Sequence, residues 1–231
     1  MSTPTAEPAQ PDALDAQAFL AALDDPIGRL AREHGPVDFT LPSHGLVLPD
    51  HLERLTLGIV GQLISVKAAL VIFGRLRELL GGRIEATALA RTNEASLRAV
   101  GLSGAKARAV QALGHEVANG LLDFEALAAL DDVQAEARLV ALRGIGSWSA
   151  QMFLLRALGR PDVFPAGDLG LRRGIESLYA LRAMPSIPEA AERALAWRSY
   201  RSYAAKYLWL HYGAAADTCP PAPNEGGVLS P

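Results

Sequence analysis

The sequence of 231 residues contains a single cysteine, Cys219, and no long apolar run. One cysteine cannot form a disulfide within the chain, and it cannot ligate zinc or an iron–sulfur cluster by itself. Residues 1–16 contain no basic residue and no apolar stretch, so we expect no secretory signal, and no segment is long enough to span a bilayer. These absences predict a cytoplasmic protein without an iron–sulfur cluster and without a membrane anchor.

The sequence also lacks the positive charge that is typical of nucleic-acid-binding proteins, since its formal net charge is −3. Residues 1–25 contain five acidic residues and no basic one, which leaves 20 acidic against 22 basic residues in the remainder. Basic residues gather in two places, at Arg172 with Arg173, and at Arg198 with Arg201 and Lys206. Any contact with DNA must therefore be local, and ordinary solvated charges are the alternative interpretation.

The pattern of apolar residues predicts an all-α fold. Half of the residues are hydrophobic, enough for one domain or two closely packed halves. Apolar residues at helical spacing predict one long helix from Leu55 to Leu80, ended by Gly81 and Gly82. Shorter helices are expected at 93–100, 104–119, 131–142, 147–159, 168–179, 188–195 and 199–212. Residues 37–39 and 46–48 are short apolar runs that could be extended. We expect one helical domain over 13–216, between disordered tails at 1–12 and 217–231.

A glycine-rich turn at Arg143–Gly146 joins two of these predicted helices within a hairpin at about 138–159. Glycine permits positive φ and the close approach of another surface. The unpaired amides at the start of the second helix favour a phosphate, so this turn could hold a DNA backbone without a large positive charge. A plain turn between two helices, closed by glycines, is the alternative.

Five segments in order resemble the helix-hairpin-helix DNA glycosylase superfamily, most closely its 3-methyladenine DNA glycosylase II type. They are IVGQLISVKAA at 59–69, GLSGAKARA at 101–109, the hairpin at 142–150, DVFPAGDLGLRR at 162–173 and WRSYRSYAAKYLW at 197–209. The resemblance runs from about Leu55 to Gly213. It implies two helical subdomains that flank a cleft. Larger relatives add an N-terminal β-rich domain, whereas about 45 residues precede the shared region here, and we expect a helical extension in its place.

The resemblance implies that Asp168 is the catalytic residue for hydrolysis of an N-glycosidic bond in DNA. Breaking this bond leaves an oxocarbenium-like sugar, which a carboxylate stabilises while it orients the attacking water. From the local sequence, Asp168 is also a candidate N-cap of the helix that follows, and the two roles are compatible. Relatives often carry two adjacent acids here, whereas this chain has Gly167 before Asp168.

The resemblance places Trp148, Met152, Phe153 and Tyr200 at the pocket for the extruded base. Trp148 stands where bifunctional members keep a Schiff-base lysine, and the hairpin contains no lysine. We therefore expect a monofunctional enzyme that leaves an abasic site. A stacked Trp148 would attract a cationic base, while a place in the core is the alternative for Trp148, and simple packing is the alternative for Tyr200.

Further residues align with the DNA contacts of the superfamily. Leu63 and Gln62 align with the segment that fills the gap left by the extruded nucleotide, although Leu63 also neighbours a core stripe on its predicted helix. Backbone contacts are expected at Ser65, Lys67, Gly144, Ile145, Gly146 and Ser147. A monovalent cation held by carbonyls near Arg143, Gly144 and Gly146 is a feature of the family that the sequence leaves open, and no other cofactor is expected.

The function that these residues predict is the excision of alkylated purines from double-stranded DNA by a monomeric glycosylase. The expected substrates are N3- or N7-methylated purines and exocyclic etheno adducts, whose nucleotide must leave the duplex before the bond is cut. Two alternatives remain. One is a helix-hairpin-helix protein that binds DNA without catalysis, and the other is a glycosylase for another base lesion.

Overall fold

The computed structural model describes residues 13–40, 48 and 50–216, and these residues form α-helices, one 3-10 helix and loops, with no strand among them. In chain order the helices are α1 (Ala13–Ala21), α2 (Pro26–His34), α3 (His51–Gly61), α4 (Val66–Leu79), α5 (Ala86–Arg91), α6 (Glu94–Ala99), α7 (Gly104–Ala118), α8 (Phe124–Ala129), α9 (Asp132–Val140), α10 (Ser147–Arg156), α11 (Leu169–Leu178), α12 (Ile187–Arg193), η1 (Ala194–Trp197) and α13 (Arg201–Ala216). The predicted all-α fold is confirmed. Both predicted tails and Cys219 lie outside the described residues.

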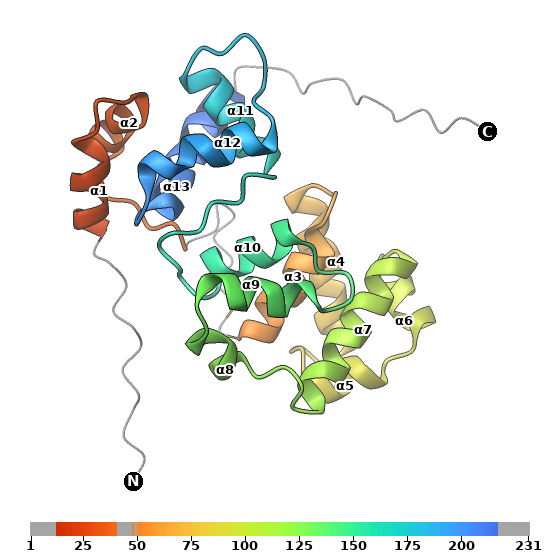
Figure 1. The fold of residues 1–231 in the computed structure, drawn as a ribbon. Coiled ribbons are helices and arrows are strands. Elements are labelled where there is room, and N and C mark those ends of the chain that lie inside the picture. Colours follow the sequence, from red (N-terminus) through yellow and green to blue (C-terminus); the bar gives the residue numbers. More distant parts are fainter. Residues whose placement is uncertain (1–12, 41–47, 49, 217–231) are drawn as a thin grey trace.

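The helices form two groups (Figure 1). The middle lobe contains α3 to α10, in which α3 packs against α4, α7 and α10, and α7 packs against α5 and α6. The terminal lobe joins the two ends of the chain, because α1 and α2 pack against α13, which also contacts α11. The expected helical extension before the shared region is therefore present as α1 and α2, and it is built into the terminal lobe.

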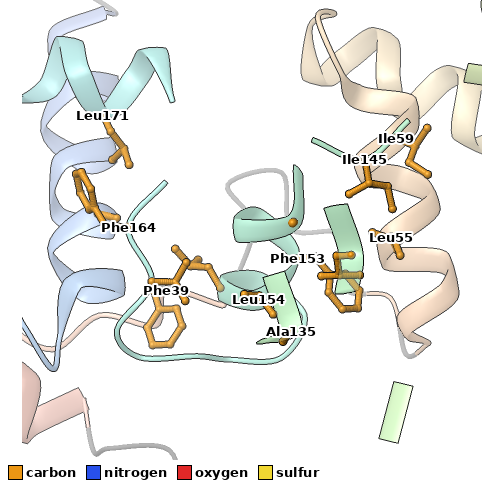
Figure 2. Close-up of a cluster of buried hydrophobic side chains, with 14 of the residues drawn as sticks. Phe39, Leu55, Ile59, Ala135, Ile145, Phe153, Leu154, Phe164 and Leu171 are labelled. Atoms are coloured by element: carbon orange, nitrogen blue, oxygen red, sulfur yellow. The ribbon is translucent and has the colours of Figure 1, made fainter. Parts of the chain in front are cut away.

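A continuous apolar core connects the lobes. Figure 2 shows part of it, with Phe164 and Leu171 on the terminal side and Leu55, Ile59 and Ile145 on the middle side. All five side chains are buried. The removal of this apolar surface from water stabilises the helices, most of which are too short to be stable alone.

The prediction of one helix from Leu55 to Leu80 is wrong, because the chain breaks into α3 and α4 at residues 62–65. Leu63 has a φ of 57°, which no α-helix accommodates. Ser65 then starts α4 as its N-cap, accepting a hydrogen bond from the Ala68 amide at 3.3 Å. Periodicity continues across the break because both helices bury a face in the same lobe.

Most of the other predicted helices are found within a few residues of their expected bounds. The predicted helix at 188–195 is divided into α12 and η1, and the short helices α5 and α8 were not predicted. Residues 37–39 are neither helical nor extended strand, and residues 46–47 lie outside the described residues.

Candidate active site and nucleic-acid interface

Asp168 lies at the junction of the two lobes and accepts three hydrogen bonds from three different elements. Its Oδ1 accepts from the Leu171 amide at 2.9 Å and from Trp209 Nε1 at 3.0 Å, while its Oδ2 accepts from Trp148 Nε1 at 3.0 Å. The predicted capping role is thus confirmed, because the bond to Leu171 caps α11. The second oxygen lies on the side of Trp148, which is 36% exposed.

The segment before Asp168 is fixed by α13. Arg201 binds Asp162 through two hydrogen bonds, of 2.7 Å from Nε and 2.9 Å from Nη2. Ser202, which is fully buried, donates from Oγ to the Arg160 carbonyl at 2.6 Å and accepts from the Val163 amide at 3.1 Å. These bonds give the chain little freedom where it approaches Asp168, as a preorganised carboxylate requires.

Gly170 leaves room for the two side chains that meet beside it. A Cβ atom at this position would lie 3.1 Å from Asp168 Oδ1 and 3.4 Å from Trp209 Cδ1. Gly167 differs, because a Cβ there would meet nothing within 4 Å. No neighbouring atom therefore requires a glycine at position 167.

Sequence reasoning missed two residues of this site, Trp209 and Arg156. The Arg156 guanidinium lies 4.8 Å from the centre of the Trp209 ring, a cation–π contact between α10 and α13. Burial lowers the pKa of Arg156, while the negative charge of Asp168 acts in the opposite direction, and a guanidinium stays charged in either case. Trp209 is the last residue of the segment WRSYRSYAAKYLW. It lies far from Asp168 in the sequence, so no local pattern indicates that the two residues are in contact.

Among the predicted pocket residues, Met152 and Phe153 lie on different faces of α10. Met152 is half-buried one helical turn after Trp148 on α10, so the two share a face. The prediction for Phe153 is corrected, because its ring is buried in the core, 5.9 Å from His51 and 5.8 Å from Phe124. On a helix, the residue that follows Met152 faces about 100° away from it, which turns Phe153 inward.

Tyr200 has the packing role that the sequence left open as its alternative. Its ring centre lies 5.2 Å from that of Phe19 in α1 and 6.0 Å from that of Tyr203 in α13. It thus helps to attach α1 to the terminal lobe.

Of the two predicted wedge residues, Leu63 alone projects from the surface. Its relative exposure is 104%, whereas an apolar side chain of this size is normally at least partly covered. The Gln62 side chain turns inward, and its Nε2 donates to the Gly144 carbonyl at 3.0 Å and to Ser149 Oγ at 2.9 Å. This corrects the predicted wedge role of Gln62, whose side chain joins the 62–65 loop to the hairpin.

In the turn between α9 and α10, the positive φ that its glycines predict occurs at Gly144. Gly144 has a φ of 82°, and a Cβ there would lie 2.5 Å from Ala109 Cβ of α7. No side chain caps the first turn of α10, whose N-cap is Gly146. Ile145 is an exception to the predicted contacts, because its side chain is buried and its amide donates to the Leu142 carbonyl at 3.2 Å.

The remaining predicted backbone contacts lie on exposed residues. Gly144, Gly146, Ser147, Ser65 and Lys67 are all exposed. The Ser147 hydroxyl donates to Glu136 of α9, and Ser65 caps α4.

Two of the three carbonyls suggested for a monovalent cation, those of Gly144 and Gly146, each accept a hydrogen bond within the protein. Gly144 O accepts from Gln62, and Gly146 O accepts from the Ala150 amide at 3.0 Å as the first hydrogen bond of α10. A cation at this turn stays a prediction, and no step of the chemistry is assigned to it.

Most of the clustered basic residues are engaged within the protein. Arg173 pairs with Glu176 at 2.8 Å, Arg172 donates to the Pro185 carbonyl at 2.7 Å, and Arg201 binds Asp162. Burial lowers the pKa of Lys206, and Arg198 is exposed. The interpretation of these clusters as a basic DNA-binding patch therefore has little support from their geometry.

Residues 57–199 match the family of HhH-GPD superfamily base excision DNA repair proteins. The chain belongs to this superfamily. The matched range contains the 62–65 loop, the hairpin and Asp168, whereas Trp209 lies beyond it. The resemblance found in the sequence is confirmed.

Similar proteins of the HhH-GPD superfamily carry 3-methyladenine glycosylase names. The chain is 30% identical over 173 residues to the DNA-3-methyladenine glycosylase of Bacillus subtilis (strain 168), an alignment that covers 70% of this chain and 57% of that relative. A solved Schizosaccharomyces pombe 3-methyladenine DNA glycosylase in complex with abasic DNA superimposes with a TM-score of 0.76 at 27% identity, covering 84% of this chain and 95% of that one. The DNA-3-methyladenine glycosidase of Bacillus halodurans gives a TM-score of 0.75 at 32% identity, with 87% and 91% covered.

Over the described residues, none of the helices combines the length and apolar character needed to cross a membrane.

Proposed function

We propose that this chain is a monofunctional DNA glycosylase that removes N3- and N7-alkylated purines, and etheno adducts, from double-stranded DNA and acts as a monomer. The observation that carries the proposal is the carboxylate of Asp168, held between two indole N–H groups and a helix N-terminus beside an exposed Trp148. Membership of a base excision repair superfamily and the names of the similar proteins support it.

The chemistry needs one carboxylate. As the N-glycosidic bond breaks, positive charge develops on the deoxyribose, and the fixed negative charge of Asp168 stabilises it. Oδ1 is occupied by two hydrogen bonds, so Oδ2 is the oxygen that faces the sugar and orients the attacking water. A purine methylated at N3 or N7 is already cationic and departs without an acid, and the π face of Trp148 favours such a base. An etheno adduct is neutral, and solvent supplies the proton that this base takes up as it departs.

Cleavage of the DNA backbone is not expected. The hairpin at 138–159 contains no lysine, whose amine would be needed near the sugar for a Schiff base. Treatment with borohydride during the reaction should therefore trap no covalent complex between the protein and DNA. A trapped complex would contradict the monofunctional assignment.

The decisive experiment compares the native chain with Asp168→Asn on methylated duplex DNA. Asparagine keeps the size of the side chain and an oxygen that can cap α11, so the substitution removes the charge and the oxygen that accepts from Trp148. We expect release of methylated purine to fall at least ~100-fold in single-turnover experiments. Duplex binding, measured by fluorescence anisotropy, should change little.

Two outcomes would support the alternative functions. A native chain that binds duplex DNA but releases no base would indicate a DNA-binding protein without catalysis. Release of uracil or of mispaired adenine, with methylated purines left intact, would indicate a glycosylase for another lesion.

A further inference from the structure

Lys106 makes two short hydrogen bonds to the chain on either side of Gly61. It lies in the first turn of α7, and its Nζ donates to the Val60 carbonyl at 2.8 Å and to the Gln62 carbonyl at 2.6 Å. Both carbonyls lie at the end of α3, where a cation interacts favourably with the helix dipole. Burial lowers the pKa of Lys106, in keeping with an ammonium that is directed into the protein.

The segment that these bonds hold is strained. Leu63 has a φ of 57°, a conformation that costs free energy for any residue with a Cβ, and its side chain is wholly exposed. The exposed side chain of Leu63 contributes no stability to the free protein. The surrounding bonds must therefore maintain this conformation.

The other side of the segment is fixed by the hairpin. Gln62 donates to the Gly144 carbonyl and to Ser149 Oγ, and Gly144 in turn packs against Ala109 of α7. Lys106 and Ala109 lie on the same helix, so α7 supports both the 62–65 loop and the turn of the hairpin.

We propose that Lys106 is a positioning residue that holds the 62–65 loop so that Leu63 is presented in its inserting conformation before DNA binds. The proposal rests on the proposed function, in which Leu63 fills the gap left by the extruded nucleotide. Loss of the two hydrogen bonds releases the carbonyls of Val60 and Gln62, and the loop relaxes toward conformations that withdraw Leu63. The catalytic group is unaffected, because Asp168 is held by other elements.

The test exploits the difference between paired and mispaired lesions. Extrusion costs least for a mispaired base, so a defective wedge slows release chiefly from a fully paired site. We would measure single-turnover release of 7-methylguanine opposite cytosine and opposite adenine, for the native chain, Lys106→Met and Lys106→Arg. Lys106→Met should slow release from the paired site about tenfold and from the mispaired site much less. Lys106→Arg should recover part of the loss because it keeps a charged donor.

A matched control and a double-mutant cycle separate this role from a general one. Arg108→Met removes an exposed positive charge from the same helix and should leave the ratio of the two rates unchanged. In a Leu63→Ala background, Lys106→Met should cause no further change in that ratio, since both changes remove the same interaction.

Equal slowing at both sites, no slowing at either, or full additivity with Leu63→Ala would overturn the proposal. If Lys106→Met does not fold, as judged by circular dichroism, Lys106→Ala provides the same comparison, because alanine also lacks a donor. A native chain that releases no base from either duplex would instead contradict the proposed function.

Discussion

The two carboxylate oxygens of Asp168 accept different sets of hydrogen bonds. Oδ1 accepts from Leu171 and Trp209, which fixes the rotation of the carboxylate, and Oδ2 accepts only a single hydrogen bond, from Trp148, among the described contacts. Hydrogen bonds to a charged acceptor contribute about 1.5–3 kcal/mol each. The orientation of the Asp168 carboxylate thus depends on Trp209, which lies on another helix.

Trp209→Phe should slow base release while leaving DNA binding nearly unchanged. Phenylalanine keeps a ring beside Arg156 and Gly170 but removes the N–H that fixes Oδ1. We expect a decrease of about tenfold in the single-turnover rate, corresponding to roughly 1.4 kcal/mol of lost orientation. Rates at saturating protein and binding to an uncleavable duplex would be measured in parallel.

Trp197→Phe is the matched control for this substitution. Trp197 is fully buried, and its Nε1 has no hydrogen-bond partner among the described atoms. The same change of residue should therefore lower stability through lost packing without slowing the folded protein. An equal loss of rate in both variants would show that the Trp209 hydrogen bond has no special role.

At the residue scale, the sequence predicts the capping role of Asp168 but not the hydrogen bond that Trp209 donates to it. The capping role follows from local spacing, because an N-cap bonds to an amide three residues away. The bond from Trp209 crosses 41 residues and depends on how α13 packs against α11. No local pattern contains that information.

At the scale of elements, the turn between α9 and α10 contains two glycines with different requirements. Gly144 has positive φ and touches Ala109 of α7, whereas Gly146 has a φ of −94° and open space where a Cβ would stand. Only the first position needs glycine for folding.

Gly144→Ala should destabilise the protein by about 1–3 kcal/mol, through both backbone strain and the displacement of α7. Gly146→Ala should change stability by less than about 0.5 kcal/mol. Urea denaturation of both variants, followed by circular dichroism, measures the difference. Similar losses of stability in the two variants would contradict the assigned role of the contact with Ala109.

The error in the predicted helix from Leu55 to Leu80 also belongs to this scale. Hydrophobic periodicity reports which face is buried, and it does not register one residue at positive φ. Ser65 was the available local signal, since serine favours an N-cap position. The bonds that hold the break come from Lys106, more than forty residues away in sequence, so tertiary structure determines where α3 ends.

At the scale of the whole molecule, hydrogen bonds from two tyrosine hydroxyls connect the N-terminal helices to the C-terminal helices. Tyr207 of α13 donates to the Gly35 carbonyl at 2.7 Å, and Tyr179, after α11, donates to Asp25 before α2. Burial raises the pKa of Tyr207 to about 12 and raises that of Tyr179 further, with the charge of Asp25 contributing to the second shift. The all-α class was predictable from the sequence, but this closure of the chain ends was not, because it depends on contacts across most of the chain.

These raised pKa values predict a loss of stability at alkaline pH. Unfolded tyrosine ionises near pH 10, whereas the folded hydroxyls keep their protons, so the unfolded state binds fewer protons above that pH. The stabilisation is complete below about pH 10 and declines as the pH rises toward about 12 for Tyr207. At pH 11 the contribution of Tyr207 to the free energy of unfolding should have fallen by about 1 kcal/mol.

Tyr207→Phe should be less stable than the native chain at pH 9, and it should lose correspondingly less stability between pH 9 and pH 11. Urea denaturation at both pH values measures this difference, and comparison of the two chains cancels the titration of lysines that they share. Equal losses in the two chains would show that the Tyr207 hydroxyl does not couple closure of the terminal lobe to pH.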